Sequence, residues 1–339
     1  MISYSKKKAG SKFPPQIMVV EDEAIVSLDI QGRLKSLGYQ VAGVASSGDQ
    51  AIQLSNEKLP DLILMDIMLE GEMDGIDTAS MIKKTQDIPI IYLTAYADND
   101  TLSRAKITEP FGYIIKPFED RELSLTIEMA LYKHHTESAL KESLRHMNRI
   151  FDETVASLTV MSEKRDPYTS GHQQRVAELA CRIAVKMKLS TKEINSIRIA
   201  GILHDVGKIS IPAEILSKPT RLTDLEMNLM KTHSEAGYEI LKGISFPWPV
   251  AQIVLQHHER MDGTGYPNRL GGESILQEAR IIAVADVVEA MSSHRPYRAA
   301  LGLPRAMAEI ARGRGTSYDP DVVDACTHLI EEDNFSFDK

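Results

Sequence analysis

Short apolar runs recur between Gln16 and Phe118, and amphipathic stretches of helical length separate them. The runs are IMVV, VAGVA, LILM, IPIIYL and YII. Strands that are covered on both faces of a parallel sheet have this continuous apolar character, whereas half-exposed strands alternate with polar residues. The pattern therefore predicts a doubly wound α/β domain built on a five-stranded parallel sheet.

Polar side chains stand at the carboxyl ends of these predicted strands, where open α/β sheets place their functional groups. They are Glu21, Asp22, Asp66, Thr94 and Lys116. Several carboxylates at one edge repel one another unless a hard cation such as Mg²⁺ binds among them. Asp66 is then a candidate nucleophile toward a phosphoryl group, Lys116 can pair with the phosphorylated carboxylate, and the Thr94 hydroxyl can bond to the phosphate. A single carboxylate here would more often be a helix cap, but helix capping does not explain the full set.

This constellation resembles the receiver domain of response regulators over about Gln16 to Lys133. The resemblance implies that Asp66 is the phosphoacceptor, that Glu21 and Asp22 complete a Mg²⁺ site, and that a cognate histidine kinase is a partner. The implied switch residues are Thr94, Tyr113 and Lys116. Glu21 departs mildly from the family, in which many members have Asp at this position. Glutamate keeps the negative charge, but its longer side chain puts the Mg²⁺ affinity slightly in doubt.

In the second half of the chain, histidines and acidic residues recur in an ordered series of motifs. They are HDVGK from His204, the isolated His233, HHERMDGTGYP from His257, and VADVVEAM around Asp286. Imidazole and carboxylate suit first-row divalent ions, and an Asp can bridge two ions. A single His-Asp dipeptide is more often a solvated helix end or a satisfied core pair. The recurrence in order instead predicts a divalent-metal hydrolase.

Two further features suit a phosphodiester substrate. Lys208 follows His204 by four residues, so on a continuing helix the two side chains share a face. Gly263, Gly265 and Pro267 give the segment DGTGYP backbone freedom and then a fixed stop, as in a loop that approaches a ligand closely. Alone, a surface lysine and a plain tight turn would explain the same residues.

Together these motifs resemble the HD-GYP family, an all-α branch of the HD superfamily whose members hydrolyse cyclic di-GMP. The resemblance covers about Ile150 to Ile330. It implies two transition-metal ions, Fe or Mn, with Asp205 as the bridging and catalytic carboxylate and Lys208 as the residue that stabilises the attacked phosphate. The implied metal ligands are His204, Asp205, His233, His257, His258 and Asp286.

The same resemblance bears on substrate contacts and on the number of ions. The implied substrate-binding residues are Tyr266, Arg295, Arg298 and His172. Some family members hold a third ion through a Glu four residues before the histidine that aligns with His172, and this chain has Tyr168 there. A neutral phenol replaces a carboxylate poorly, so we expect two ions, with Glu163 as the nearby residue that could restore a third site.

The segment from Glu119 to Glu163 contains neither Pro nor Gly and is rich in helix formers. Apolar residues with four-three spacing predict a parallel coiled coil and hence a homodimer. The seam residues are Leu140, Leu144, Met147, Phe151, Thr154, Leu158 and Met161. Packing of the same stripe on its own catalytic domain is an equally good interpretation. Beyond this helix, Gly171 precedes another predicted helix, and Thr223 with Glu226 predicts a capping box.

The domain organisation that we expect is a receiver domain over 16–133, a linker helix over 134–165 and a phosphodiesterase domain over 150–335. The 339 residues exceed one typical domain. A net charge of −9 argues against nucleic-acid polymers as partners, and no apolar run is long enough for membrane insertion. Cys181 and Cys326 are predicted to be reduced packing residues in a cytoplasmic protein.

The sequence thus predicts a two-component response regulator whose phosphorylation governs metal-dependent hydrolysis of cyclic di-GMP to linear pGpG, and it leaves open whether hydrolysis continues to GMP. Two other interpretations stay open. One is an HD phosphohydrolase that acts on another nucleotide, and the other is a catalytically silent signalling adaptor that binds partner proteins. The GYP segment argues against the first, and the complete ligand set argues against the second.

Overall fold

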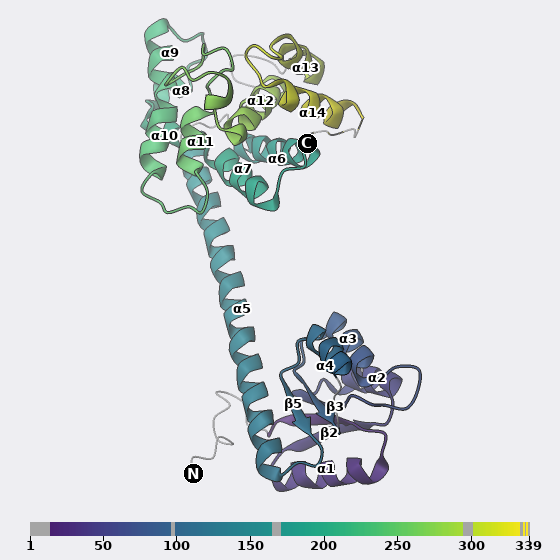
Figure 1. Cartoon of the computed structure of the whole chain (residues 1–339). Coiled ribbons are helices and arrows are strands. Elements are labelled where there is room, and N and C mark those ends of the chain that lie inside the picture. Colours follow the sequence, from purple (N-terminus) through teal and green to yellow (C-terminus); the bar gives the residue numbers. More distant parts are fainter. Residues whose placement is uncertain are drawn as a thin grey trace. The chain divides into compact units, whose positions relative to one another are not determined.

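The computed structural model describes residues 14–95, 99–164, 171–293 and 301–332, together with residues 335 and 337. The chain divides into an N-terminal unit, Met1–His146, and a C-terminal unit, Met147–Lys339 (Figure 1). Helix α5 (Asp120–Glu163) begins in the first unit and ends in the second. The sequence predicts one long helix or two nearly continuous ones over this segment, and the structure has one.

The N-terminal unit contains the predicted five-stranded parallel sheet, with strand order β2-β1-β3-β4-β5. The strands are β1 (Gln16–Val20), β2 (Gln40–Ala45), β3 (Leu62–Asp66), β4 (Ile90–Thr94) and β5 (Gly112–Ile115). The helices between them are α1 (Ala24–Ser36), α2 (Gly48–Lys58), α3 (Gly75–Thr85) and α4 (Asn99–Ile107). Figure 1 shows α2, α3 and α4 on one side of the sheet.

Both faces of this sheet are buried, which explains the continuous apolar runs of its strands. Ile17 and Val19 of β1 pack with residues of α1 and α5, while their neighbours Met18 and Val20 pack with residues of α2, α3 and α4. Successive side chains of a strand point to opposite faces, so a strand between two helical layers must be apolar at every position. The doubly wound architecture follows from this pattern.

The C-terminal unit is helical, as predicted. Its α-helices are α6 (His172–Lys186), α7 (Thr191–Leu203), α8 (Ala213–Leu216), α9 (Asp224–Lys231), α10 (His233–Leu241), α11 (Val250–Gln256), α12 (Gln277–Ser292), α13 (Leu303–Arg312) and α14 (Pro320–Glu331). The short 3-10 helices η2 (Val206–Ser210) and η3 (Gly272–Ser274) interrupt the series. Its core is formed mainly by α6, α7, α11 and α12, with α14 packed against them.

Two of the predicted local signals are confirmed. Gly171 is the N-cap of α6 with a φ of 70°, a conformation that a residue without Cβ adopts at little cost. Thr223 caps α9 through the amide of Glu226, and the Glu226 side chain bonds back to the amide of Thr223. The sequence also predicts that Asp166 and Pro167 end the long helix, and these two residues lie outside the described part of the chain.

Helix α5 is buried only near its two ends. Leu123, Ile127 and Ala130 pack on the sheet of the N-terminal unit. Val155, Thr159 and Ser162 are buried in the C-terminal unit. Every residue from 139 to 150 is exposed. Among the described residues, we find no helix with the length and apolarity that a membrane crossing requires.

Candidate functional site

Five helices of the C-terminal unit bring ligand-type residues together. His172 opens α6, His204 and Asp205 follow α7, and His233 opens α10, while the remaining residues come from the end of α11 and the middle of α12. These last residues are His257, His258 and Asp286. Sequence motifs separated by up to about a hundred residues thus meet at one place, as predicted for ligands of a shared metal centre.

The ligand atoms form two groups on either side of Asp205. One group contains His172, His204 and Asp286, and the other contains His233, His257 and His258; within each group the ligand atoms lie within 4.8 Å of one another. Asp205 Oδ2 is 3.4 Å from His204 Nε2, and Asp205 Oδ1 is 3.5 Å from His233 Nε2. Each carboxylate oxygen of Asp205 therefore faces a different group, as a bridging ligand requires.

Backbone carbonyls orient three of the imidazoles. The Nδ1 atoms of His204, His233 and His257 lie 2.7, 2.7 and 2.5 Å from the carbonyl oxygens three residues earlier in the chain. A proton on Nδ1 leaves Nε2 with its lone pair directed to the centre of the site, which is the arrangement found for metal-binding histidines. His204 Nε2 is buried and has no hydrogen-bond partner among the described residues. A buried nitrogen that lacks a hydrogen bond and lies near the Asp205 carboxylate fits a metal ligand.

The electrostatics of the site also favour bound cations. Burial and the neighbouring His204 and His233 lower the pKa of His257 to about 3, so its imidazole is neutral. Burial opposes ionisation of Asp205, but Lys208, His204 and His233 outweigh it and hold the pKa of Asp205 well below its usual range. Metal binding needs neutral imidazoles and ionised carboxylates. The residues present thus fit divalent transition-metal ions.

His172 lies closer to the ligands than the sequence suggested, because its Nε2 atom is 3.3 Å from Asp286 Oδ1 and 3.8 Å from Asp205 Oδ2. Burial disfavours its imidazolium, yet Asp286 and Glu289 outweigh that effect and raise the pKa of His172 to about 9. Positive charge is therefore favoured at this position among carboxylates. The sequence predicts His172 to be a substrate contact, whereas the structure groups it with two metal-ligand candidates.

Glu289 and Arg175 support His172 and were missed in the sequence. Glu289 is 1% exposed, forms an ion pair with His172 Nδ1, and also accepts from Arg175 Nε at 2.7 Å. Ser293 donates to the same carboxylate at 2.7 Å. Glu289 follows Asp286 by three residues on α12, so the two carboxylates share a helix face. This spacing of three residues is the sequence feature from which a role for Glu289 beside Asp286 could have been predicted.

The segment DGTGYP forms a loop that is tied to the ligand-bearing turn. Glu259, next to His258, is 2% exposed and accepts from the amides of Asn268 at 2.7 Å and Leu270 at 3.0 Å. The Tyr266 ring stacks on His258 with a centroid distance of 4.7 Å and an interplanar angle of 30°. The loop thus brings the Tyr266 ring beside the second ligand group.

Two lysines lie close to these ligands. Lys208 Nζ is 2.6 Å from Asp205 Oδ2. Lys208 lies on the 3-10 helix η2, so α7 does not continue to this residue as a single helix. Lys231 Nζ lies 5.4 Å from the centroid of the Tyr266 ring, a contact that sequence reasoning missed. Arg295 and Arg298, which were predicted substrate contacts, lie outside the described residues.

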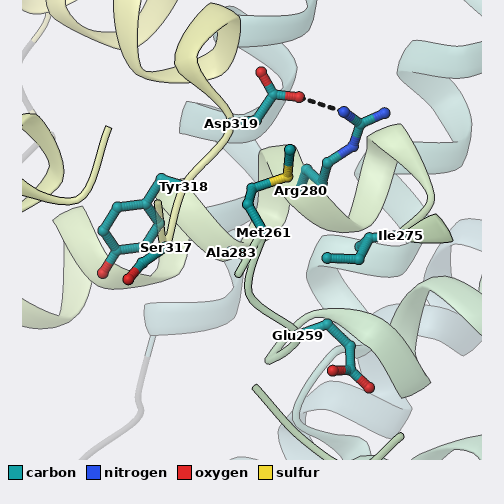
Figure 2. Close-up of a pocket in the computed structure, with 8 residues that line it drawn as sticks. All are labelled: Glu259, Met261, Ile275, Arg280, Ala283, Ser317, Tyr318 and Asp319. Atoms are coloured by element: carbon teal, nitrogen blue, oxygen red, sulfur yellow. Dashed lines mark hydrogen bonds and ion pairs between the residues drawn. The ribbon is translucent and has the colours of Figure 1, made fainter. Parts of the chain in front are cut away.

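A small pocket lies beside Glu259, and none of the ligand-type histidines lines it (Figure 2). Its lining residues are Glu259, Met261, Ile275, Arg280, Ala283, Ser317, Tyr318 and Asp319. Arg280 of α12 pairs with Asp319 at 2.5 Å, as the dashed line in Figure 2 marks. The amide of Met261 also donates to the carbonyl of Ser317 at 3.3 Å. These contacts brace the turn that follows His258 and contribute no group to the metal site.

In the N-terminal unit, the predicted residues meet at the carboxyl edge of the sheet. Lys116 Nζ lies 2.6 Å from Glu21 Oε2 and 2.5 Å from Asp66 Oδ2. Glu21, Asp22 and Asp66 form one group of possible cation ligands. Burial raises the pKa of Glu21 to about 7, an effect that Lys116 opposes and Asp66 increases. Glu21 Oε1 is buried without a partner among the described residues, which fits a Mg²⁺ ligand.

The predicted switch residues lie at the ends of β4 and β5. Thr94 is 6% exposed at the end of β4, and Tyr113 is half-buried on β5. The Tyr113 ring lies 5.9 Å from the ring of Tyr92, and its hydroxyl has no hydrogen-bond partner within the described part of the chain. If the Tyr113 side chain takes another rotamer, its hydroxyl can form a hydrogen bond there without breaking one that it makes now.

Comparison with known proteins accounts for both units. The model of the response regulator receiver domain matches residues 17–128, and the model of the HD domain matches residues 157–322. The cyclic di-GMP phosphodiesterase response regulator RpfG of Xanthomonas campestris pv. campestris is 38% identical over 281 residues, which are 78% of this chain and 74% of that protein. A cyclic di-GMP phosphodiesterase of Thermotoga maritima is 35% identical over 337 residues, or 93% and 90% of the two chains. The 3′3′-cGAMP-specific phosphodiesterase 3 of Vibrio cholerae is 36% identical over 167 residues, covering 49% of this chain and 36% of that protein.

Proposed function

The chain belongs to the response regulators that join a receiver domain to an HD phosphodiesterase domain, and from this premise we propose that it hydrolyses cyclic di-GMP under the control of phosphorylation at Asp66. The observation that carries the proposal is the position of Asp205, whose two carboxylate oxygens face two separate groups of ligands. Such a site suits in-line displacement at a phosphodiester. The relatives that are similar over most of their length carry the same activity in their names.

We assign one divalent ion to His172, His204 and Asp286 and a second to His233, His257 and His258, with Asp205 shared between them. Fe or Mn suits these ligands, which are nitrogen and oxygen donors without a thiolate. When bound, two such ions lower the pKa of an attacking water and offset charge on the oxygens of the phosphodiester.

The protein's own residues supply orientation and charge. Lys208 Nζ is close enough to Asp205 to contact a phosphate oxygen at the same site, where its ammonium would offset the charge that develops during displacement. The Tyr266 ring offers a flat face beside His258 for a base or a ribose edge. Lys231, which sits over that ring and has no ion-pair partner among the described residues, is a second cation for a dinucleotide with two phosphates.

In the receiver domain, we assign Mg²⁺ to Glu21, Asp22 and Asp66, with Asp66 as the phosphoacceptor and a histidine kinase as the donor partner. Lys116 is already paired with Asp66, so it is placed to neutralise an acyl phosphate. The switch residues in this assignment are Thr94, Tyr113 and Lys116.

A homodimer through α5 is part of the proposal. Leu140, Leu144 and Met147 are exposed on the stretch where α5 buries no residue, which supports a seam there. Phe151 instead packs on the core of its own unit, with its ring centroid 6.2 Å from that of Phe246, and Leu158 also packs on this core. The predicted coiled coil is thus supported in its first half, while in the second half Phe151 and Leu158 pack within their own domain and Met161 is exposed.

The test is turnover of purified full-length protein with Mn²⁺ or Fe²⁺ on a panel of cyclic di-GMP, 3′3′-cGAMP and linear pGpG. We expect cyclic di-GMP to be the best substrate, with linear pGpG accumulating before GMP. If the protein prefers 3′3′-cGAMP, the substrate assignment is wrong, while the assignment of the active site is retained. Lack of turnover with every substrate and either metal would refute the enzymatic function and favour an adaptor.

A further inference from the structure

The last turns of α5 bond to the segment that carries Asp205. Ser162 is 4% exposed, and its hydroxyl donates to the carbonyl oxygen of Asp205 at 3.3 Å. Thr159, one turn earlier and 2% exposed, has its hydroxyl 3.1 Å from the carbonyl oxygen of Val155 and 3.5 Å from that of Ile202. Val155 is buried in the core of the same unit. The end of α5 is therefore packed against the last turn of α7 and the segment that leads from it to η2.

Ser162 differs from the exposed hydroxyl residues of the same helix. The hydroxyls of Thr154 and Ser157 bond to carbonyl oxygens four residues earlier, at 2.7 and 2.8 Å. This local bond is the usual one for Ser and Thr inside a helix. Ser162 bonds instead to a residue 43 positions along the chain. A buried hydroxyl needs a partner, and here that partner belongs to the metal-binding turn.

The carbonyl of Asp205 is held from two sides. It accepts from the amide of Lys208 at 2.9 Å, the bond that forms the first turn of η2, and it accepts from Ser162 as well. Asp205 leaves the helical conformation of α7 with a φ of −97° and a ψ of 5°. Fixing this peptide plane fixes the direction in which the Asp205 side chain leaves the backbone. It also fixes the turn that brings Lys208 back to the Asp205 carboxylate.

We propose that Ser162 is a positioning residue for Asp205 and Lys208, and that its hydrogen bond is the point at which movement of α5 reaches the metal site. This inference rests on the proposed function, which makes Asp205 the shared ligand. Helix α5 begins at Asp120 in the receiver domain and runs without a break to Glu163. A rotation of α5 about its axis displaces the Ser162 hydroxyl from the Asp205 carbonyl and loosens the turn.

The experiment compares Ser162→Ala with Ser157→Ala in the full-length protein. Ser157 is a matched control because it lies on the same helix, is exposed, and bonds only within that helix. Four quantities are measured. They are kcat and KM for cyclic di-GMP with Mn²⁺, the Kd of Mn²⁺ from the electron paramagnetic resonance signal of the free ion, and the ratio of rates with and without acetyl phosphate.

We expect Ser162→Ala to lower kcat and to weaken Mn²⁺ binding by roughly two- to tenfold each, the size of one lost hydrogen bond, with little change in KM. The rate ratio with and without acetyl phosphate should move toward one. Ser162→Thr, which keeps the hydroxyl, should restore both Mn²⁺ binding and the rate ratio. If Ser162→Ala does not fold, Ser162→Cys nearly conserves the shape and donates only weakly, so it takes its place.

The inference is wrong if Ser162→Ala matches Ser157→Ala in Mn²⁺ binding and in its response to acetyl phosphate. A drop in thermal stability without a change in Mn²⁺ binding would equally overturn it, because the hydroxyl would then serve only packing. If the parent protein hydrolyses no cyclic dinucleotide, the proposed function fails, while the Mn²⁺ titration still decides the role of Ser162.

Discussion

Gly265 is the residue of the GYP loop at which a single methyl group should have the largest effect. A Cβ on Gly265 would lie 2.4 Å from the Cα atom of Glu259 and 2.5 Å from the amide nitrogen of Arg260. Ordinary contact begins at 3.4 Å, so Gly265→Ala requires a displacement of about 1 Å. The obstructing atoms are backbone atoms of the turn after His258. The loop, which carries Tyr266, must therefore move.

A displacement of this size takes the Tyr266 ring off His258 and changes how the substrate is held. Misplacement by about 1 Å costs on the order of a hundredfold in rate, and overpacking costs roughly 1–3 kcal/mol of stability. We expect kcat/KM of Gly265→Ala for cyclic di-GMP to fall by about that factor. The metal content should stay at the parent value, because the candidate ligands belong to helices and helix ends outside the loop.

Gly243→Ala is the matched control, because a Cβ at Gly243 meets no atom within 4 Å. Steady-state kinetics with Mn²⁺ and elemental analysis of both variants provide the comparison. The reasoning is refuted if Gly265→Ala retains kcat/KM within about twofold of Gly243→Ala at equal metal content. Loss of metal from Gly265→Ala would also contradict it, since the loop would then help to form the metal site.

Four further predictions follow from the two sites and from α5. Asp66→Asn should abolish acyl phosphate formation from acetyl phosphate, because an amide does not attack phosphorus; phosphate uptake by the variant would disprove the assignment. Asp205→Ala should lose both ions while Lys208→Ala keeps them and loses turnover, and parental activity in Asp205→Ala would show that the site is misplaced. Leu140→Glu combined with Leu144→Glu should shift the protein toward monomer in light scattering, because like charges would face each other in the seam; an unchanged mass speaks against the coiled coil. Anaerobically purified protein should contain two ions per subunit by elemental analysis, and three tightly held ions would invalidate the inference from Tyr168.

The sheet and most of the ligand groups were predictable because their signals are local. Continuous apolar runs arise from burial on both faces, and a ligand placed where a helix ends keeps the same neighbours in the sequence as in space. His172 was harder to interpret, since its partners Asp286 and Glu289 lie more than a hundred positions away. No spacing rule connects α6 to α12.

Two other features could not have been found from periodicity. Phe151 and Leu158 follow the same four-three spacing as Leu144, yet they pack on their own domain, because a helical stripe looks alike whether it faces a second copy or the same chain. The bond from Ser162 to the Asp205 carbonyl involves a backbone atom, which leaves no trace in residue identity. Features of this kind depend on tertiary packing alone.

The candidate ligands of the C-terminal domain belong to α6, α10, α12 and the ends of α7 and α11, so ions bound there would link most elements of the domain core. Folding and metal supply are then thermodynamically linked, because an ion that binds only the native state stabilises it by RT ln(1 + [M]/Kd). At a free metal concentration of a hundred times Kd this amounts to about 2.7 kcal/mol per ion. Under the proposed assignment, removal of the metal would therefore lower the thermal stability of the C-terminal domain as well as empty its site.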